Sequence, residues 1–290
     1  MVNKSAITLL SLCKSIKIED LQSQFPASTI YACDFYIEGI EKETSIIGGF
    51  RSKTIINIDH HAPIEDMANF TTSTSLAVAY VQSYGSARND EKIVINHTDC
   101  DSILSSLVIA GILQPKEEYK YAALCADHTG EISEISEILQ ALEKERDLEL
   151  SSQALLYFVS TGKIAQNVMP YISAYKACRE RVRDFISNAY YVDDIAVVQI
   201  DNKIQSLMLL PYFPQAKIIM AISPHSLYPE KTAISIIRGP MAPKNLYINT
   251  LPLPQEFGGR WNMGSNKRSG GTSFPIDSYI KIIQEALKRF

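Results

Sequence analysis

The feature that most constrains the fold is a design repeated in three short segments. In residues 28–34, 53–61 and 92–101, a run rich in β-branched residues leads directly into acids or histidines. Apolar runs of this length, bounded by polar residues, predict buried strands, most naturally of a parallel sheet. Helix-like stretches follow at 72–83, 102–113, 117–125 and, with many charges, 131–149. Strands that alternate with helices predict an α/β fold built on a parallel sheet.

The predicted strands all end in residues that can carry out chemistry. The carboxyl ends of parallel strands meet along one edge of the sheet, where open α/β sheets bind their ligands. Seven ionisable side chains follow the three strands: Asp34, Asp59, His60, His61, His97, Asp99 and Asp101. Asp127 adds a further acid in the segment Asp127-His128-Thr129-Gly130-Glu131. We therefore expect these side chains to line a single crevice.

The mixture of histidines and acids predicts a metal site. Four of the five histidines fall in the three clusters around residues 59–61, 97–101 and 127–131. Imidazole and carboxylate ligands together suit manganese, iron, cobalt or magnesium better than a structural zinc, which prefers thiolates. The acids are numerous enough to bridge two ions. Each pair alone could instead cap a helix, as Asp101 could for a helix beginning at Ser102, but three such clusters favour metal binding.

The second half of the chain predicts a different, smaller domain. Residues 151–189 have a helical pattern, and short apolar runs at 195–200, 216–222, 232–238 and 246–250 predict a second sheet. A glycine-rich loop at 258–272 and an amphipathic helix at 278–290 close the chain. We predict an α/β metal-binding domain over 1–150, a helical linker over 151–189 and an α+β substrate-binding domain over 190–290. A length of 290 residues agrees with two domains.

The glycine-rich loop has a positive character. Its basic residues, with one from the preceding strand, are Arg238, Arg260, Lys267 and Arg268. Glycine allows a close backbone approach, and the guanidinium fork matches phosphate or carboxylate. We predict that these four residues bind an anionic substrate; the alternative is a solvated basic loop. Trp261 could stack on a base or sugar, or pack beneath the loop.

Charge and cysteine usage limit the partners. With 28 basic and 32 acidic residues, the net charge of −4 provides no general attraction for nucleic acid. We therefore expect a small substrate rather than a long nucleic acid. The apolar run at 6–13 is too short to span a bilayer, and five cysteines without a CxxC pair indicate reduced thiols. These features predict a cytoplasmic protein without membrane association; its oligomeric state is open, with a homodimer as one alternative.

Several of these motifs together resemble the DHH phosphoesterase superfamily. The sequence Ile56-Asn57-Ile58-Asp59-His60-His61, preceded by Asp34, is similar to the motif that names the family, and Asp127-His128-Thr129-Gly130 looks like its late Asp-x-Thr-Gly motif. Residues 234–238, 257–261 and 270–271 resemble the associated DHHA1 substrate-binding domain. One departure concerns His97-Thr98-Asp99-Cys100-Asp101: the family's longer His-x-x-x-Asp-x-Asp motif comes first in the chain, whereas here it follows the triplet. A permuted strand order could bring the same side chains to one sheet edge.

The resemblance implies a set of roles. A DHH-like metal domain would be joined by the helical linker to a DHHA1-like domain, and would bind two ions, of Mn²⁺ or alternatively Mg²⁺ or Co²⁺. Asp34 would bridge the ions, with His97 and Asp99 on the first. His60, Asp101 and Asp127 would hold the second. His61 would face the substrate and Asp59 would orient a histidine.

These roles predict a divalent-metal-dependent hydrolase, in first place a phosphoesterase that cleaves a small phosphate ester or nucleotide with a metal-activated water. Two alternatives stay open. The same pair of ions could hydrolyse a non-phosphate bond, such as an amide or a guanidino compound, because a fold does not fix chemistry. The protein could also be a non-catalytic ligand-binding relative. The number of acids argues against this last alternative, since carboxylates gathered in a crevice repel one another without a cation.

Overall fold

The structure of the chain is a computed structural model, which describes residues 7–11, 15–26, 28–42, 44–61, 71–254 and 257–290. It has the mixed α/β character predicted from the sequence. Within these residues, no helix combines the length and the apolar character needed to cross a membrane. The cysteines in the described part, Cys33, Cys100, Cys125 and Cys178, form no disulfide.

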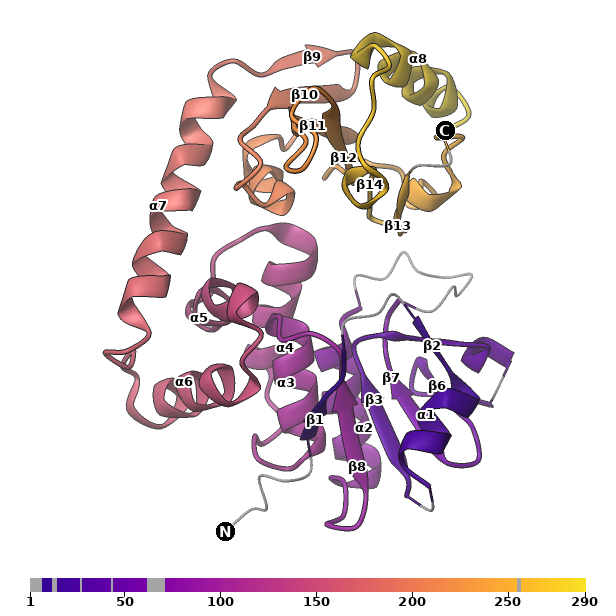
Figure 1. The fold of residues 1–290 in the computed structure, drawn as a ribbon, viewed down its shortest axis with the longest axis vertical. Helices are drawn as coiled ribbons and strands as arrows, with labels where there is room; N and C mark the ends of the chain where they lie inside the picture. The colour runs from indigo at the N-terminus through magenta and orange to yellow at the C-terminus, as the bar shows by residue number, and fades with distance from the viewer. Residues whose placement is uncertain (1–6, 12–14, 27, 43, 62–70, 255–256) are drawn as a thin grey trace. The chain divides into compact units, whose positions relative to one another are not determined.

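The chain divides into two compact units (Figure 1). Unit 1 comprises Met1–Asp127 and Ile132–Tyr175, and unit 2 comprises His128–Glu131 and Lys176–Phe290. A short segment inside the first half of the chain is therefore grouped with the second half. The predicted boundaries at 150 and 190, and the assignment of the two units to DHH and DHHA1 domains, stay predictions.

Unit 1 is built on a six-stranded sheet with the order β1-β8-β3-β7-β6-β5. The four strands from β1 to β7 in this order are parallel, and β6 and β5 continue the sheet as an antiparallel hairpin. The strands are β1 (Ile7–Leu9), β3 (Ile30–Cys33), β5 (Thr44–Ile46), β6 (Gly49–Arg51), β7 (Ile55–Ile58) and β8 (Lys92–Ile95). A small parallel pair, β2 (Ser15–Lys17) and β4 (Tyr36–Glu38), lies outside this sheet.

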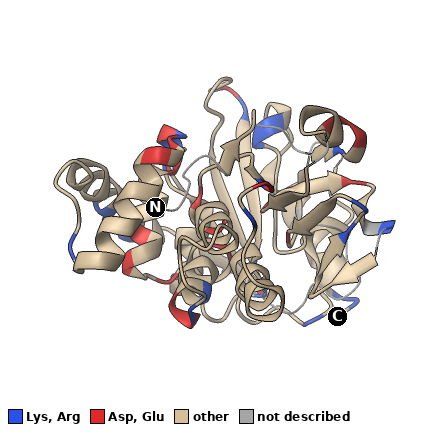
Figure 2. Cartoon of the chain, turned by 90° about the horizontal axis from the view of Figure 1, so that it is seen from below, with Lys and Arg blue, Asp and Glu red and all other residues tan. Residues whose placement is uncertain are grey.

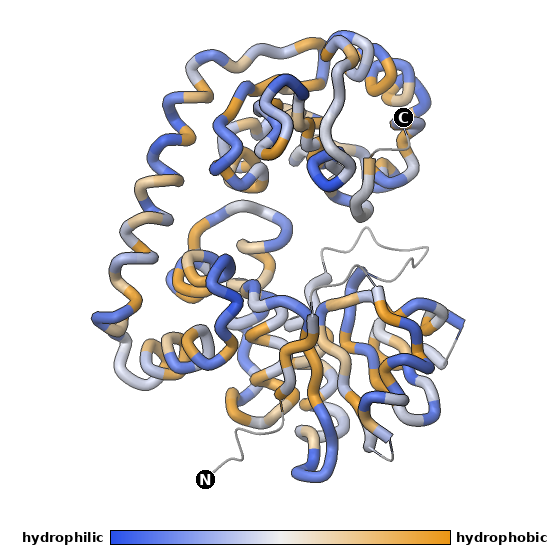
Figure 3. Tube along the Cα trace, viewed as in Figure 1, coloured by the Kyte–Doolittle hydropathy of each residue, from blue (hydrophilic) through white to orange (hydrophobic). Residues whose placement is uncertain are grey.

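Both faces of this sheet are buried because its central strands are apolar on both sides. Successive residues of a strand point to opposite faces, so Tyr31 and Cys33 of β3 enter one core while Ile30 and Ala32 enter another. The first core is covered by α2 (Ser73–Tyr84) and α3 (Cys100–Ile109), and the second includes Leu21 of α1 (Ile18–Gln24). Figure 3 shows hydrophobic stretches along the strands. The continuous apolar runs noted in the sequence therefore correspond to strands buried on both sides.

The other helices of unit 1 differ from the prediction in one respect. They are α4 (Glu117–Leu124), α5 (Glu134–Leu142) and α6 (Leu148–Thr161), and α7 (Met169–Ile186) runs from unit 1 into unit 2. The single helix expected over 131–149 is wrong. A 3-10 turn, η4 (Glu143–Glu145), ends in a left-handed residue, Arg146, with φ of 51°, and the next helix begins after this break.

Unit 2 contains a second six-stranded sheet with the order β13-β14-β12-β11-β10-β9. Only the β10–β11 pair is parallel. The strands are β9 (Tyr190–Val192), β10 (Ile195–Gln199), β11 (Ile218–Pro224), β12 (Thr232–Arg238), β13 (Gly258–Arg260) and β14 (Met263–Ser265). The amphipathic helix α8 (Ile276–Leu287) packs its apolar side into the core of this sheet through residues such as Tyr279 and Ile283.

The strand expected over 246–250 is absent from this sheet. Residues Ile248–Thr250 form a short 3-10 helix, η6. Ile248 of this helix and Leu246, which precedes it, belong to the core of unit 2. Two further 3-10 segments are η5 (Ser206–Tyr212) and η7 (Lys267–Ser269), and η2 (Ile40–Lys42) lies in unit 1. Leu246 and Ile248 of this segment are thus buried, but not in a strand.

Candidate metal centre

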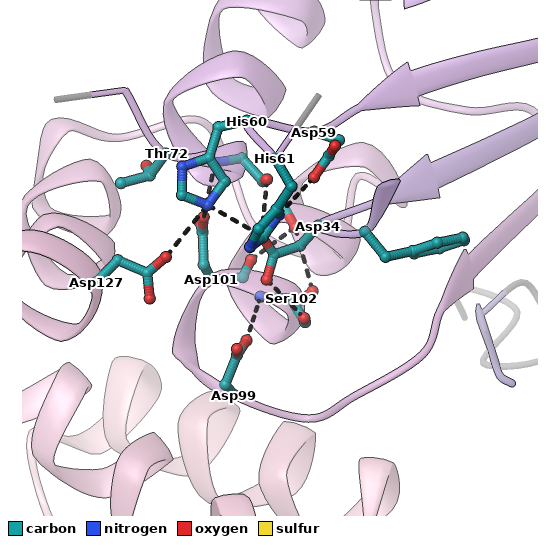
Figure 4. Close-up of polar contacts among 12 residues, drawn as sticks. Asp34, Asp59, His60, His61, Thr72, Asp99, Asp101, Ser102 and Asp127 are labelled. Carbon is teal, nitrogen blue, oxygen red and sulfur yellow. Dashed lines mark hydrogen bonds and ion pairs between the residues drawn. The ribbon is translucent and has the colours of Figure 1, made fainter. Parts of the chain in front are cut away.

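The structure brings the predicted ligands of unit 1 together at the carboxyl ends of three adjacent strands. Strands β8, β3 and β7 are neighbours in the sheet, and Asp34 follows β3 as His60 follows β7 and His97 follows β8. Figure 4 shows most of these side chains pointing toward one another. Among the groups whose ligand atoms lie within 4.8 Å of one another, two share Asp34 but no histidine: Asp34, His60, Asp101 and Asp127, and Asp34, His97 and Asp99. Asp34, His60 and His61 form a further group. Clustered Asp and His side chains of this kind could hold metal ions.

Asp34 lies at the centre because it belongs to both groups. It is fully buried and has a left-handed backbone with φ of 62°, a region that Asp tolerates better than most residues. Its amide donates to Ile58 O at 3.0 Å, which extends the ladder between β3 and β7. The buried Asn57 side chain donates to Ala32 O and Phe35 O, each at 3.3 Å. The turn that presents Asp34 is thus braced on both sides.

His60 faces the first group with one ring nitrogen. Its Nδ1 donates to Thr71 O at 2.7 Å, because a carbonyl can only accept. This bond fixes the ring and directs Nε2 toward three carboxylates. The distances from His60 Nε2 are 3.2 Å to Asp127 Oδ2, 3.4 Å to Asp34 Oδ1 and 3.5 Å to Asp101 Oδ2. A metal-binding histidine commonly donates its other N–H to a carbonyl in this way.

These distances fit metal ligation better than direct hydrogen bonding. An N–H···O bond to a carboxylate is normally about 2.7–2.9 Å long, and His60 Nε2 approaches none of its three carboxylates that closely. Two ligand atoms that are each about 2.1 Å from one ion lie about 3.0–3.4 Å apart at tetrahedral or octahedral angles. The spacing around His60 Nε2 has this magnitude. The donor set of one imidazole and three carboxylates therefore fits a divalent cation.

His97 and Asp99 form the second group with the other oxygen of Asp34. His97 Nε2 lies 2.9 Å from Asp99 Oδ2 and 3.2 Å from Asp34 Oδ2. The other ring nitrogen, Nδ1, contacts the side-chain oxygen of Asn96. Asp99 also caps α3, since its Oδ1 accepts from Ser102 N at 2.9 Å. The cap expected at this helix is thus supplied by Asp99, and Asp101 lies inside the first turn.

Asp101 caps a helix as well, but a different one. Its two oxygens accept from Ser73 N at 2.7 Å and Thr74 N at 2.6 Å, at the N-terminus of α2. A carboxylate at a helix N-terminus satisfies free N–H groups and complements the helix dipole. Asp101 therefore joins α3 to α2 and at the same time presents Oδ2 to His60. The structural and the metal-binding interpretations of this residue are compatible.

The charges of the two groups influence one another strongly. Burial alone would raise the pKa of Asp34, but the neighbouring His60 and His97 rings hold that pKa well below its usual range. Burial and the neighbouring Asp34 charge raise the pKa of Asp101 well above its usual range. Burial would lower the pKa of His97, but attraction to Asp99 and Asp34 raises it to about 12. The cluster thus carries more negative charge than its histidines balance easily, which favours a bound cation.

Asp59 and His61 form a pair beside these groups. His61 Nδ1 lies 2.7 Å from Asp59 Oδ1, and Asp59 is fully buried. His61 packs edge-on against the His60 ring and remains partly exposed, with 26% of its side chain accessible. Because the carboxylate accepts from Nδ1, it fixes the ring orientation of His61. That Asp59 orients a histidine stays a prediction, and His61 is the histidine that it contacts.

Asp127 comes from a π-helical turn, η3 (Cys125–Thr129), that follows α4. Turns of this type occur mostly within helices at functional sites, because the extra residue changes the direction of a side chain. Here the turn places Asp127 Oδ2 near His60 Nε2. The next residue, His128, belongs to unit 2, where it stacks on Trp261 and contacts the Asn262 side chain at 3.1 Å. Trp261 is buried.

The predicted substrate-binding residues lie in unit 2, and their environments differ. Arg238 donates to the carbonyls of Leu246, Ala242 and Pro243 at 2.8–3.1 Å, so its guanidinium holds the loop after β12. Lys267 is partly buried in η7, and burial lowers the pKa of its ammonium. Arg268 is exposed, and the side chain of Arg260 lies outside the described part of the structure. Their role toward a substrate stays a prediction.

Sequence reasoning missed the hydroxyl groups around Asp34. Ser73 Oγ donates to Asp34 Oδ1 at 2.9 Å, and Ser102 Oγ donates to Asp34 Oδ2 at 2.8 Å. Ser73 belongs to the run Thr72-Ser73-Thr74-Ser75, which indicates a helix start but does not reveal which hydroxyl reaches a carboxylate. The bracing role of Asn57 had no signal beyond its position two residues before Asp59.

Comparisons with known proteins leave the family open. No protein-family model matches the chain, and no curated protein matches it. Among solved structures, a pGpG-specific phosphodiesterase, PggH from Vibrio cholerae, is similar with 12% identity and a TM-score of 0.48, over 93% of this chain and 87% of that one. An uncharacterized protein from Helicobacter pylori G27 has 11% identity and a TM-score of 0.24, over 89% of this chain and 98% of that one. With TM-scores below 0.5, neither similarity defines the fold or the activity of this protein.

Proposed function

We propose that the protein is a divalent-metal-dependent phosphoesterase of the DHH type that acts on a small phosphate ester or nucleotide. The observation that carries the proposal is the arrangement around His60. One ring nitrogen is fixed by a carbonyl, and the other faces three buried carboxylates at 3.2–3.5 Å. This spacing fits ligands of a shared cation and is long for charged hydrogen bonds.

Two ions would be held by the two groups that share Asp34. His60, Asp101 and Asp127 would bind one ion, and His97 and Asp99 the other. We propose Mn²⁺, with Mg²⁺ and Co²⁺ as alternatives, because the donors are imidazole nitrogens and carboxylate oxygens. When bound, such cations would lower the pKa of water in the site and neutralise charge on phosphoryl oxygens.

The protein's own groups would then orient the substrate and manage protons. Asp59 contacts Nδ1 of His61, and we propose that Nε2–H of the protonated ring would hydrogen-bond a phosphoryl oxygen or protonate a leaving oxygen. In unit 2, Arg238, Arg260, Lys267 and Arg268 remain our candidates for contacts with the anionic substrate. The preference for a small substrate is supported by charge: basic residues are interspersed with acidic ones along the chain (Figure 2), and the net charge is −4.

The proposal is tested by combining metal analysis with a hydrolysis screen. The metal-free protein is titrated with Mn²⁺ and then assayed on panels of phosphomonoesters, phosphodiesters and nucleotides, and on amides and guanidino compounds. We expect phosphate-ester cleavage that depends on Mn²⁺ and is lost in Asp34→Asn and His60→Gln. Asp90→Asn, which changes an exposed acid of unit 1, is the control and should behave like wild type.

The other outcomes are equally informative. Mn²⁺ binding with turnover of amides or guanidino compounds alone would replace the phosphoesterase by a hydrolase of a non-phosphate bond. Stabilisation by a small ligand without any divalent metal would favour a binding protein. Full activity of His60→Gln would remove the observation on which the proposal depends.

A further inference from the structure

We infer that Ser73 and Ser102 are positioning residues that hold the Asp34 carboxylate so that each of its oxygens serves a different metal ion. The inference rests on the proposed function and concerns how its two ions are kept apart and bridged. It assigns a role to two buried hydroxyl groups on two different helices.

The two oxygens of Asp34 have distinct neighbours. Oδ1 accepts from Ser73 Oγ at 2.9 Å and lies 3.4 Å from His60 Nε2 and 3.6 Å from His61 Nδ1. Oδ2 accepts from Ser102 Oγ at 2.8 Å and lies 3.2 Å from His97 Nε2. Each oxygen thus has one hydroxyl donor and faces one of the two metal-binding groups.

The lone pairs of the Asp34 carboxylate explain how the two serines could influence metal binding. An ionised carboxylate offers about four acceptor positions, roughly two on each oxygen. The two serine hydroxyl groups occupy one position on each oxygen and leave the other available for a cation. A carboxylate held from both sides cannot rotate to give both oxygens to one ion. The serines therefore favour a bridge with one oxygen on each ion.

The serines are themselves fixed by the backbone of two helices. Ser73 is the first residue of α2, and its amide donates to Asp101 Oδ2 at 2.7 Å. Ser102 lies in the first turn of α3, and its amide donates to Asp99 Oδ1 at 2.9 Å. Both serines are fully buried. Two of the proposed ligands therefore fix the residues that orient a third, so that the three acids form one connected network.

A simpler explanation is that the serines only satisfy a buried carboxylate. On that explanation their removal would lower stability without changing how metal binds. Groups that orient a ligand from behind typically change metal affinity by about 10–100-fold when they are removed. The two explanations therefore differ in a measurement that folding alone does not influence.

The test uses Ser73→Ala, Ser102→Ala and the double variant, each prepared without metal. Ser106→Ala is the matched control, because Ser106 is also buried on α3 and its hydroxyl donates to a backbone carbonyl, Ile103 O at 3.1 Å. Mn²⁺ binding is followed by calorimetric titration. Electron paramagnetic resonance detects the exchange coupling between two bridged Mn²⁺ ions. Circular dichroism and thermal unfolding show whether each variant is folded.

We expect wild type and Ser106→Ala to bind two Mn²⁺ ions with a coupled signal. Each single variant should bind one of the ions about 10–100-fold more weakly, and the double variant should lose the coupled signal. Equal affinities and equal coupling in all variants would overturn the inference while leaving the proposed function in place. If wild type binds no Mn²⁺, the proposed function itself fails, and a single ion in wild type overturns the bridge. Should one variant not fold, the other single variant decides.

Discussion

Substitutions of Asp99 can separate its two roles, which are the cap of α3 and the contact with His97. Asp99 Oδ1 caps α3 by accepting from Ser102 N at 2.9 Å, and Oδ2 lies 2.9 Å from His97 Nε2. Asp99→Ala removes both contacts. Asp99→Ser removes only the contact with His97, because serine caps a helix about as well as aspartate.

The contacts of Asp99 give the expected difference in unfolding free energy between the two variants. Loss of a helix cap costs about 1 kcal/mol, within a range of about 0.5–2 kcal/mol. The contact between Asp99 and His97 is lost in both variants, so its contribution cancels when the two variants are compared. Asp99→Ala should therefore be less stable than Asp99→Ser by about 1 kcal/mol. That difference corresponds to about 2–4 °C in melting temperature for a unit of this size.

The affinity for Mn²⁺, unlike the stability, should fall in both Asp99 variants. Both variants lack the carboxylate at His97, so both should bind Mn²⁺ at least about 10–100-fold more weakly than wild type. Thermal unfolding in EDTA measures the cap, and calorimetric titration with Mn²⁺ measures the ligand. If Asp99→Ser binds Mn²⁺ as tightly as wild type, Asp99 is only a cap. If the two variants are equally stable, the side chain at position 99 does not stabilise the start of α3.

Three further changes test other parts of the structure. His60→Gln should weaken Mn²⁺ binding by at least about tenfold and abolish metal-dependent stabilisation; unchanged stabilisation in a thermal-shift assay would contradict the site. Arg238→Met should destabilise unit 2 by about 2–3 kcal/mol, because three carbonyls lose a charged donor, while Mn²⁺ affinity should stay at the wild-type value. Gly130→Ala should cost at least about 1–2 kcal/mol by urea denaturation, since φ is 67° and a Cβ atom would lie 2.2 Å from Leu207 O; a neutral effect would show that this turn is not strained.

Local sequence patterns predicted the strands that carry the candidate site. β3, β7 and β8 are short, apolar and buried on both faces, so continuous runs of Ile, Val and Ala were sufficient evidence. The polar residues after each strand could be predicted to meet because the ends of parallel strands share one edge. The hairpin of β5 and β6 was not predicted from the sequence. In the structure its two-residue turn, Ile47 and Gly48, has positive φ angles typical of hairpins.

The failures concern features that depend on tertiary contacts. Ser73 and Ser102 reach Asp34 only because α2 and α3 pack with their N-termini against one strand end, and a helix-start pattern cannot specify that partner. The segment 246–250 has apolar residues suited to a strand, but its burial beside β12 and β14 is achieved as a 3-10 helix. The break at Arg146 could not be predicted either, because nothing in the sequence marks an arginine that adopts the left-handed conformation.

The two duties of Asp101 have a consequence for comparing this protein with others. Its carboxylate completes the start of α2 through Ser73 N and Thr74 N, so a chain that had lost all hydrolytic ability would still benefit from an acid there. An aspartate at this position is consequently weak evidence of activity in a relative. The histidine at position 60 is more diagnostic of the proposed metal site, because its second nitrogen faces three carboxylates at distances that fit ligands of one cation.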